Sequence, residues 1–223
     1  MNITSLRTSG TSADVIESIF ELHFPVAESV LDLTWGRGTF WNWDWRGRFT
    51  LHANDAYAYI PDTDSDIVAG SRWDFTRVVQ DLGCPEWQRW DVVVFDPPFT
   101  ANGPQRGTDR HQDRYGSTRD LNGAPQNIHD VWRLLDEGTR TACRLARLGV
   151  IVKTQDVIES GRYWDSETVA CTAVAASNFR VEDKVRLLVG RRAQPDTVRG
   201  ARIQHFRDRP SVFIVGKAQE GTR

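Results

Sequence analysis

Cysteine is scarce in this sequence, and its positions exclude two common kinds of site. There are three cysteines, Cys84, Cys143 and Cys171, with no close C-x-x-C pair and no Cys/His cluster among them. Disulfide frameworks need paired cysteines, and zinc sites need clustered ligands. The sequence therefore predicts neither a disulfide scaffold nor a metal site, and a reducing cytoplasm is the expected location.

Long apolar stretches are also missing. The N-terminal residues, MNITSLRTSGTSADVIESIF, have no basic start followed by a continuous apolar run. No other run approaches the roughly 20 apolar residues that cross a bilayer. We expect a protein that is not exported and has no membrane contact. Its 223 residues, 39% of them hydrophobic, are enough for one large core, so a single domain over residues 1–223 is expected.

The formal net charge of -2 hides a gradient along the chain. Residues 180–217 contain ten Lys and Arg against four Asp and Glu, whereas acidic side chains predominate in the first hundred residues. A polyanion would prefer the C-terminal third. A solvated basic surface without a partner explains the same gradient.

Apolar patterns predict strands that alternate with helices. The predicted strands are 29–34, 48–55, 66–75, 91–99 and 149–156, and the predicted helices are 13–24, 125–148 and 166–177, the first with Ser12 or Asp14 as N-cap. This alternation indicates an α/β domain with a mostly parallel sheet. The final segments, DKVRLLVG and PSVFIVGKA, lack an intervening helix and predict an antiparallel pair at one edge of the sheet. Residues 100–125 are too long for a simple connection and suggest a substrate loop.

The first chemical motif is VLDLTWGRGTFW. A strand that ends in Asp32 runs into Gly36-x-Gly38, and glycines let the backbone turn tightly and approach a ligand. An ordinary glycine-rich turn has the same pattern. Asp55, at the end of the next strand, favours a nucleotide pocket, because a carboxylate there can accept hydrogen bonds from ribose hydroxyls. Trp41 occupies the position of the third glycine of a dinucleotide fingerprint, which disfavours NAD.

The second motif is Asp96-Pro97-Pro98-Phe99, directly after the apolar run DVVVF. The prolines fix the backbone, so the Asp96 carboxylate and nearby carbonyls can converge on one amine. Phe99 offers a flat surface for a heterocycle. A stiff strand exit is the structural alternative. The motif stands at the carboxyl end of a predicted parallel strand, where open α/β sheets bind ligands.

Together the two motifs resemble those of S-adenosylmethionine-dependent methyltransferases of the Rossmann-like class, in particular those that methylate adenine N6 or cytosine N4 in DNA. The segment DLTWGRGT keeps the acidic residue, both glycines and the threonine of the cofactor loop, with Thr34 in place of the usual Phe and Arg37 in place of Ser. DPPF matches the catalytic motif without a gap. The similarity extends over roughly residues 24–217 and includes short bacterial and phage proteins.

This resemblance implies a fold, a cofactor and a set of site residues. The implied fold has a mostly parallel seven-stranded sheet with an antiparallel C-terminal strand and helices on both faces. The implied cofactor is S-adenosylmethionine, with no metal. Asp96, Pro97, Pro98 and Phe99 are the implied catalytic residues. The implied cofactor-binding residues are Asp32, Thr34, Gly36, Gly38, Asp55 and Asp74.

The substrate stays open at this stage. DNA is the first expectation, but RNA methyltransferases acting on guanine N2 or adenine N6, a non-catalytic binding subunit and a small-molecule enzyme are alternatives. The chain has no room for a separate recognition domain, so the loop at 100–125, a basic segment at 190–209 or a second subunit would read the target. Lys153 and His205 are further polar candidates. The predicted nucleic-acid contacts are Arg106, Arg110, Arg114, Arg119, Arg191, Arg192, Arg207 and Arg209.

Overall fold

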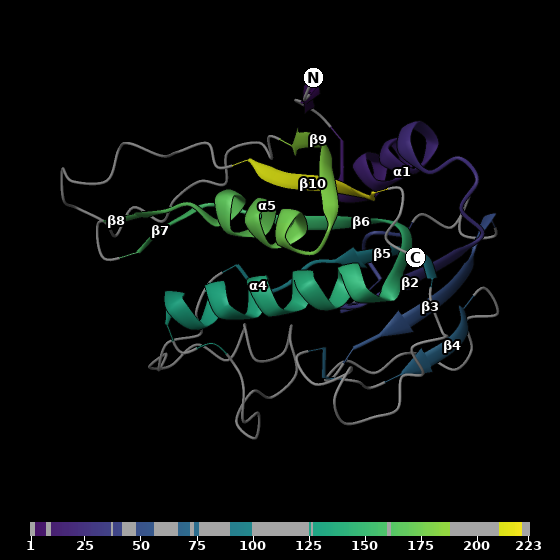
Figure 1. Ribbon diagram of the computed structural model, residues 1–223, viewed down its shortest axis with the longest axis horizontal. Coiled ribbons are helices and arrows are strands. Elements are labelled where there is room, and N and C mark those ends of the chain that lie inside the picture. Colours follow the sequence, from purple (N-terminus) through teal and green to yellow (C-terminus); the bar gives the residue numbers. More distant parts are fainter. Residues whose placement is uncertain are drawn as a thin grey trace.

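A mixed β-sheet with helices on both faces organises the described part of the chain (Figure 1). The computed structural model describes residues 3–7, 10–36, 38–41, 48–55, 67–71, 74–75, 90–99, 125, 127–159, 162–187 and 210–219. The helices are α1 (Ser12–His23), α4 (Ile128–Leu145) and α5 (Ser166–Ala176). The strands of the large sheet are β1 (Ile3–Arg7), β2 (Ser29–Asp32), β3 (Thr50–Asn54), β4 (Ile67–Ser71), β5 (Trp90–Phe95), β6 (Ala146–Thr154), β9 (Phe179–Leu187) and β10 (Ser211–Ala218).

Within the described residues, the large sheet has eight strands in the order β1-β9-β10-β6-β5-β2-β3-β4. Only β10 runs antiparallel to its neighbours, β6 and β9, and every other described pairing in this sheet is parallel. A separate small hairpin is formed by β7 (Val157–Glu159) and β8 (Arg162–Trp164). The predicted α/β class and the antiparallel C-terminal strand are confirmed.

Two details of the predicted sheet are wrong. The β9 and β10 pair does not end the sheet, because β10 lies between β9 and β6 while β1 adds in parallel to the free side of β9. The sheet therefore has eight described strands instead of seven. The short segment ITSLR carries no turn signal or apolar run that would mark it as a strand, and its pairing partner lies far away in the sequence.

Local chemistry explains where α1 begins. Thr11 is the N-cap, and its hydroxyl accepts a hydrogen bond from the Asp14 backbone N at 3.3 Å, while the Asp14 carboxylate accepts one from the Thr11 backbone N at 2.5 Å. This reciprocal capping box satisfies donors that the first helical turn leaves free. The prediction of Ser12 or Asp14 as the N-cap is therefore wrong, although Asp14 completes the capping box.

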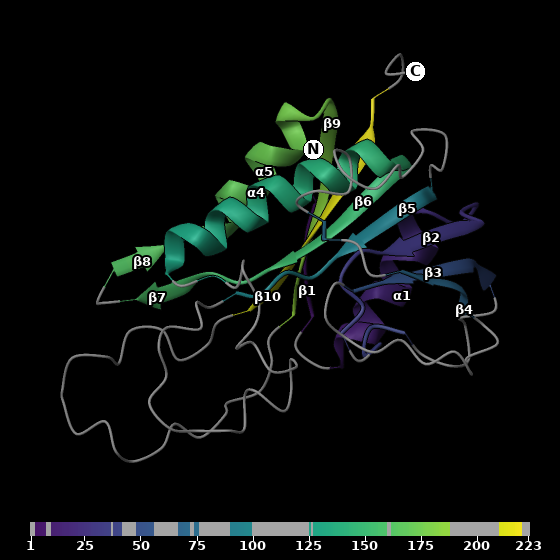
Figure 2. The same ribbon diagram turned by 90° about the horizontal axis from the view of Figure 1, so that it is seen from below.

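The core lies in two layers, one on each face of the sheet. Figure 2 shows α4 and α5 on one face and α1 on the other. On β5, Val92 and Val94 pack in the layer that contains α1, whereas Val93 and Phe95 pack in the layer under α4 and α5. A strand covered on both faces needs apolar residues at every position. This requirement explains the uninterrupted run before Asp96. No helix in the described part of the chain is long and apolar enough to cross a bilayer.

Candidate active site

The carboxyl ends of β2, β3 and β5 bring most of the predicted site residues to one edge of the sheet. Asp32 ends β2 and is only 2% exposed. Its Oδ1 accepts a hydrogen bond from the Thr34 backbone N at 3.0 Å, and its Oδ2 accepts one from Trp41 Nε1 at 2.6 Å. Asp32 therefore holds both ends of the loop that follows β2.

Burial strongly perturbs the Asp32 carboxyl group. Loss of hydration raises its pKa to about 7, and the negative charges of Asp96 and Asp55 act in the same direction. The hydrogen bonds from Trp41 and Thr34 oppose this rise only in part. A group that titrates near neutral pH therefore lies directly below the loop.

The two glycines of this loop have the backbone conformations that the motif predicts. Gly36 and Gly38 have φ angles of 56° and 65°, in the left-handed region that favours glycine. A Cβ on Gly38 would lie 2.5 Å from the Trp35 ring, whereas one on Gly36 would meet, among the described residues, only the Thr34 carbonyl oxygen, at 4.0 Å. Gly38 is thus needed for packing, whereas the described residues leave Gly36 uncrowded.

Asp55 extends the site to the end of β3. Its Oδ2 accepts a hydrogen bond from the Gly36 backbone N at 2.8 Å, which fixes the carboxylate beside the loop. The backbone N of Asp55 in turn donates to the Ser71 carbonyl oxygen at the end of β4, at 3.1 Å. The predicted cofactor carboxylate therefore lies beside the predicted cofactor loop.

The Asp96–Phe99 corner is joined to the same loop. The backbone N of Asp96 donates to Thr34 Oγ1 at 2.7 Å, so the residue that replaces the usual Phe of the motif links the two motifs. Asp96 Oδ2 accepts from Lys153 Nζ at 3.1 Å. Burial raises the pKa of Asp96, and the charge and hydrogen bond of Lys153 oppose this rise. Pro97 is buried, Pro98 is exposed and Phe99 is half-buried.

One oxygen of this corner has no internal partner. Asp96 Oδ1 is buried and accepts no hydrogen bond from the residues that the structure describes. A buried acceptor left unsatisfied costs about 1–3 kcal/mol, so native proteins rarely leave one without a purpose. A ligand N–H group that reaches this oxygen would satisfy it.

Sequence reasoning missed Asn54, whose hydrogen bonds connect the strand ends at the site. Asn54 is fully buried, its Nδ2 donates to the Leu33 carbonyl oxygen at 3.0 Å, and its Oδ1 accepts from Ser71 Oγ at 2.7 Å. These bonds join the ends of β2, β3 and β4. The available signal was a polar residue, Asn54, at the end of an apolar strand directly before Asp55.

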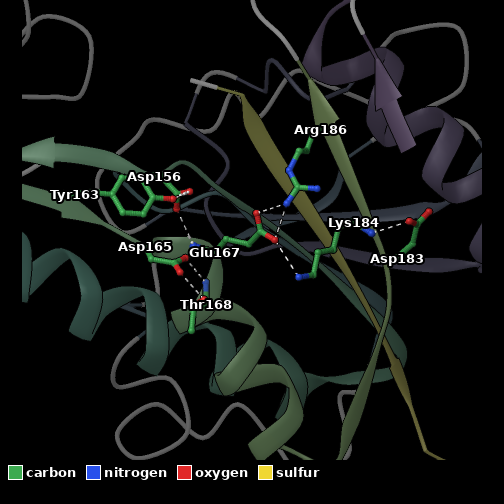
Figure 3. Close-up of polar contacts among 8 residues, drawn as sticks. All are labelled: Asp156, Tyr163, Asp165, Glu167, Thr168, Asp183, Lys184 and Arg186. Carbon is green, nitrogen blue, oxygen red and sulfur yellow. Dashed lines mark hydrogen bonds and ion pairs between the residues drawn. The ribbon is translucent and has the colours of Figure 1, made fainter. Parts of the chain in front are cut away.

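A second missed residue is Asp156, which fixes the chain after β6 (Figure 3). Its carboxylate accepts from Tyr163 Oη at 2.5 Å and from the backbone N of Glu167, in the first turn of α5, at 3.1 Å. Glu167 in turn forms ion pairs with Lys184 at 2.9 Å and Arg186 at 2.6 Å on β9. This network ties the end of β6 to α5, the small hairpin and β9.

The remaining predicted residues are Asp74 and those outside the described part of the chain. Asp74 lies beyond the end of β4, next to Phe75, whose ring packs edge-on against Phe95 at 5.0 Å. Its role with the cofactor stays a prediction. The substrate loop, the basic segment and His205 lie outside the described residues, and so do all the arginines proposed to contact nucleic acid. They are Arg106, Arg110, Arg114, Arg119, Arg191, Arg192, Arg207 and Arg209.

Comparison with known proteins identifies the fold but not a sequence family. No protein-family model matches the chain, and no curated protein matches it either. Magnesium protoporphyrin IX methyltransferase from Synechocystis, solved with bound S-adenosylhomocysteine, superposes with a TM-score of 0.52 and 9% identity, over 93% of this chain and 81% of that one.

Two further solved structures have similar scores. The 1,6-didemethyltoxoflavin-N1-methyltransferase from Burkholderia thailandensis, also with S-adenosylhomocysteine, has a TM-score of 0.51 and 11% identity, over 94% of this chain and 79% of that one. A Streptococcus thermophilus protein that carries the name of a hemolysin has a TM-score of 0.52 and 12% identity, over 97% and 69%. The chain therefore has the Rossmann-like fold of S-adenosylmethionine-dependent methyltransferases. At these identities the likeness establishes the fold, and the substrate must be argued from the site.

Proposed function

We propose that this protein is an S-adenosylmethionine-dependent methyltransferase that acts on the exocyclic amino group of a nucleobase, with adenine N6 or cytosine N4 of DNA as the first candidates. The observation that carries the proposal is the buried Oδ1 of Asp96 at the carboxyl end of β5, which accepts no hydrogen bond from the described residues. An amino group is the substrate feature that supplies N–H donors at such a point. The adjacent Pro97 carbonyl oxygen is a second acceptor for the same amine.

The residues beside this corner fit the cofactor. The described residues do not crowd Gly36, and Asp55 holds a carboxylate beside the loop, where ribose hydroxyls can donate to it. The negative charge of Asp55 suits a cationic ligand. S-adenosylmethionine supplies an activated methyl group on a positively charged sulfur. Its proposed binding residues are Asp32, Thr34, Gly36, Gly38, Asp55 and Asp74.

The corner has the chemistry that an aromatic amine needs. The lone pair of such an amine is delocalised into the ring, so the nitrogen must be held with its lone pair directed at the methyl group. Asp96 Oδ1 and the Pro97 carbonyl would accept its two N–H bonds, and Phe99 would stack on the base. Positioning of this kind contributes up to roughly 7–11 kcal/mol to catalysis. The raised pKa of Asp96 also suits its carboxylate to take the proton that the methylated amine releases.

The structural relatives do not identify the methyl acceptor, because they include a magnesium protoporphyrin IX methyltransferase and a 1,6-didemethyltoxoflavin-N1-methyltransferase. The DPPF corner and the basic C-terminal third support a nucleic acid. In duplex DNA the base must leave the stack to reach Phe99. The arginines of the 100–125 loop and the 190–209 segment are the proposed phosphate contacts, alone or with a second subunit.

The test uses the wild type and Asp96→Ala in a host whose own DNA is unmethylated. Asp136→Ala is the matched control, because Asp136 lies on the outer side of α4, where it pairs with Arg140 at 2.8 Å. Sequencing of host DNA should show N6-methyladenine or N4-methylcytosine with the wild type and the control, and neither with Asp96→Ala. Calorimetry should show S-adenosylmethionine binding by all three proteins.

Two results would contradict parts of the proposal. Unmodified DNA together with tight S-adenosylmethionine binding by the wild type refutes the DNA substrate, and RNA incubated with tritiated S-adenosylmethionine is then the next acceptor to assay. Absence of S-adenosylmethionine binding by the purified wild type refutes the methyltransferase assignment itself.

A further inference from the structure

We propose that Lys153 is a positioning residue that clamps both ends of the Asp96–Phe99 corner and thereby leaves one oxygen of Asp96 and one face of Phe99 for the methyl acceptor. The inference rests on the proposed function for its catalytic meaning. Its structural content, the clamp itself, is independent of the substrate.

The geometry of the ammonium group carries this inference. Lys153 Nζ lies 3.1 Å from Asp96 Oδ2 and 5.2 Å from the centroid of the Phe99 ring, so it contacts the first and the last residue of the corner. The same nitrogen lies 4.8 Å from the Phe40 ring centroid and 6.0 Å from that of Phe213. These distances place one cation over three aromatic rings and beside one carboxylate.

The three rings come from different parts of the site. Phe40 follows the glycine loop, Phe99 ends the corner, and Phe213 on β10 is the direct cross-strand partner of Lys153. Lys153 therefore joins the predicted cofactor loop to the predicted acceptor corner. A lysine that only ended a strand would direct its ammonium group to water, whereas the Lys153 side chain is 12% exposed.

The clamp also gives the two oxygens of the Asp96 carboxylate different roles. Oδ2 is engaged by Lys153, and Oδ1 is buried without a partner among the described residues. A carboxylate held at one oxygen cannot rotate freely, so the lone pairs of the other oxygen have a fixed direction. The substrate amine then meets an acceptor that is already oriented, which lowers the cost of positioning.

The positive charge has a second effect. Burial favours the protonated form of Asp96, and Lys153 favours the ionised form. A protonated Asp96 would present a hydroxyl donor in place of an acceptor. Removal of the Lys153 charge should therefore lower the fraction of Asp96 that is ionised at neutral pH. A higher pH should restore that fraction.

The main chain that carries Lys153 is fixed well enough for this role. Lys153 lies one residue before the end of β6, between β5 and β10 in the sheet. Asp156, three residues further on, is held by Tyr163 and by the start of α5 (Figure 3). The sheet holds the main chain at Lys153, and the contacts of Asp156 hold it three residues later. The Lys153 side chain therefore has little freedom to leave the corner.

The first experiment measures the clamp without any substrate. The Asp96 carboxyl group is followed by ¹³C NMR against pH, with Asp96→Asn for assignment. Lys153→Met and Lys153→Gln should move its titration midpoint to higher pH, and Lys153→Arg should keep it near the wild-type value. Lys217→Met is the matched control, because Lys217 also lies over a ring, Phe24, at 5.9 Å, but on another part of the sheet. An unchanged midpoint in both neutral variants would overturn the inference.

The second experiment tests the catalytic meaning with unmethylated DNA and tritiated S-adenosylmethionine. In Lys153→Met and Lys153→Gln, kcat at pH 7 should fall by about tenfold or more, with partial recovery at higher pH, because an oriented acceptor is lost. The Kd for S-adenosylmethionine should change little, and Lys153→Arg should restore most of the activity. Equal loss at every pH, with no rescue by arginine, would refute the positioning role. If the wild type methylates no DNA while the Asp96 midpoint still moves, the clamp stands and the proposed DNA substrate fails.

Discussion

Replacement of Asp32 by asparagine should remove a large pH dependence of folding stability. The Asp32 carboxyl is 2% exposed, and its pKa is about 7 in the folded protein against an ordinary 3.8. The folded state therefore holds this proton more tightly than the unfolded state does. Its stabilising effect is complete below pH 4, and it is lost as the pH rises to about 7, because the unfolded chain ionises first.

The size of the effect follows from the difference between the two pKa values. One pKa unit corresponds to about 1.4 kcal/mol, so the full difference amounts to about 4 kcal/mol. The charges of Asp96 and Asp55 contribute to this rise, so the pKa of Asp32 depends on both of these carboxylates. Asparagine cannot ionise, so the Asp32→Asn protein lacks this contribution at every pH.

The assay is urea unfolding at several pH values between 4 and 8. The free energy of unfolding of the wild type, minus that of Asp32→Asn, should decrease by about 4 kcal/mol over this range. Asp136→Asn, on the outer side of α4, is the control and should give a nearly constant difference. A constant difference for Asp32→Asn as well would refute the argument that burial keeps this carboxyl protonated.

Two further predictions, one on the glycines of the loop and one on Asp91, concern stability and can be measured by chemical denaturation. Gly38→Ala should destabilise the protein by about 1–3 kcal/mol, because its Cβ meets the Trp35 ring at 2.5 Å and its φ is positive. Gly36→Ala should cost less stability but weaken S-adenosylmethionine binding, and equal stability losses would contradict the packing difference. Burial disfavours ionised Asp91, but the backbone N–H groups of residues 28 and 29 and the Arg147 guanidinium outweigh it and keep the Asp91 pKa below its ordinary value. The stabilising effect of Asp91 over Asp91→Asn should therefore be full above about pH 4 and fade as the pH falls further, and a pH-independent difference would contradict this reasoning.

Sequence patterns predicted the features that local chemistry determines. The apolar run before Asp96 indicated a buried strand because both faces of β5 are covered, and the glycines predicted a tight loop because Gly36 and Gly38 need positive φ angles. The order of alternating elements predicted the α/β class. Each of these features depends on residues close together in the chain.

Contacts between distant residues could not be predicted in the same way. Thr34 reads as a departure from the usual motif, and nothing in its neighbourhood shows that its hydroxyl accepts from the Asp96 backbone N. Lys153 can be a strand end or a site residue until the three rings around it are placed. Asp156 has no local signal, because its partners are set by the packing of α5 and the small hairpin.

The pairing of β1 with β9 has a consequence for the order in which the protein can be completed during synthesis. Ile3 pairs with Asp183 and Arg7 with Leu187, so β1 leaves the ribosome well before the strand with which it pairs. Until β9 appears, β1 lacks the partner strand that it has in the described part of the structure. Contacts of such long sequence separation form slowly, and an unpaired strand edge invites association with other chains. The nascent protein must therefore keep this short strand from foreign partners until β9 has been made.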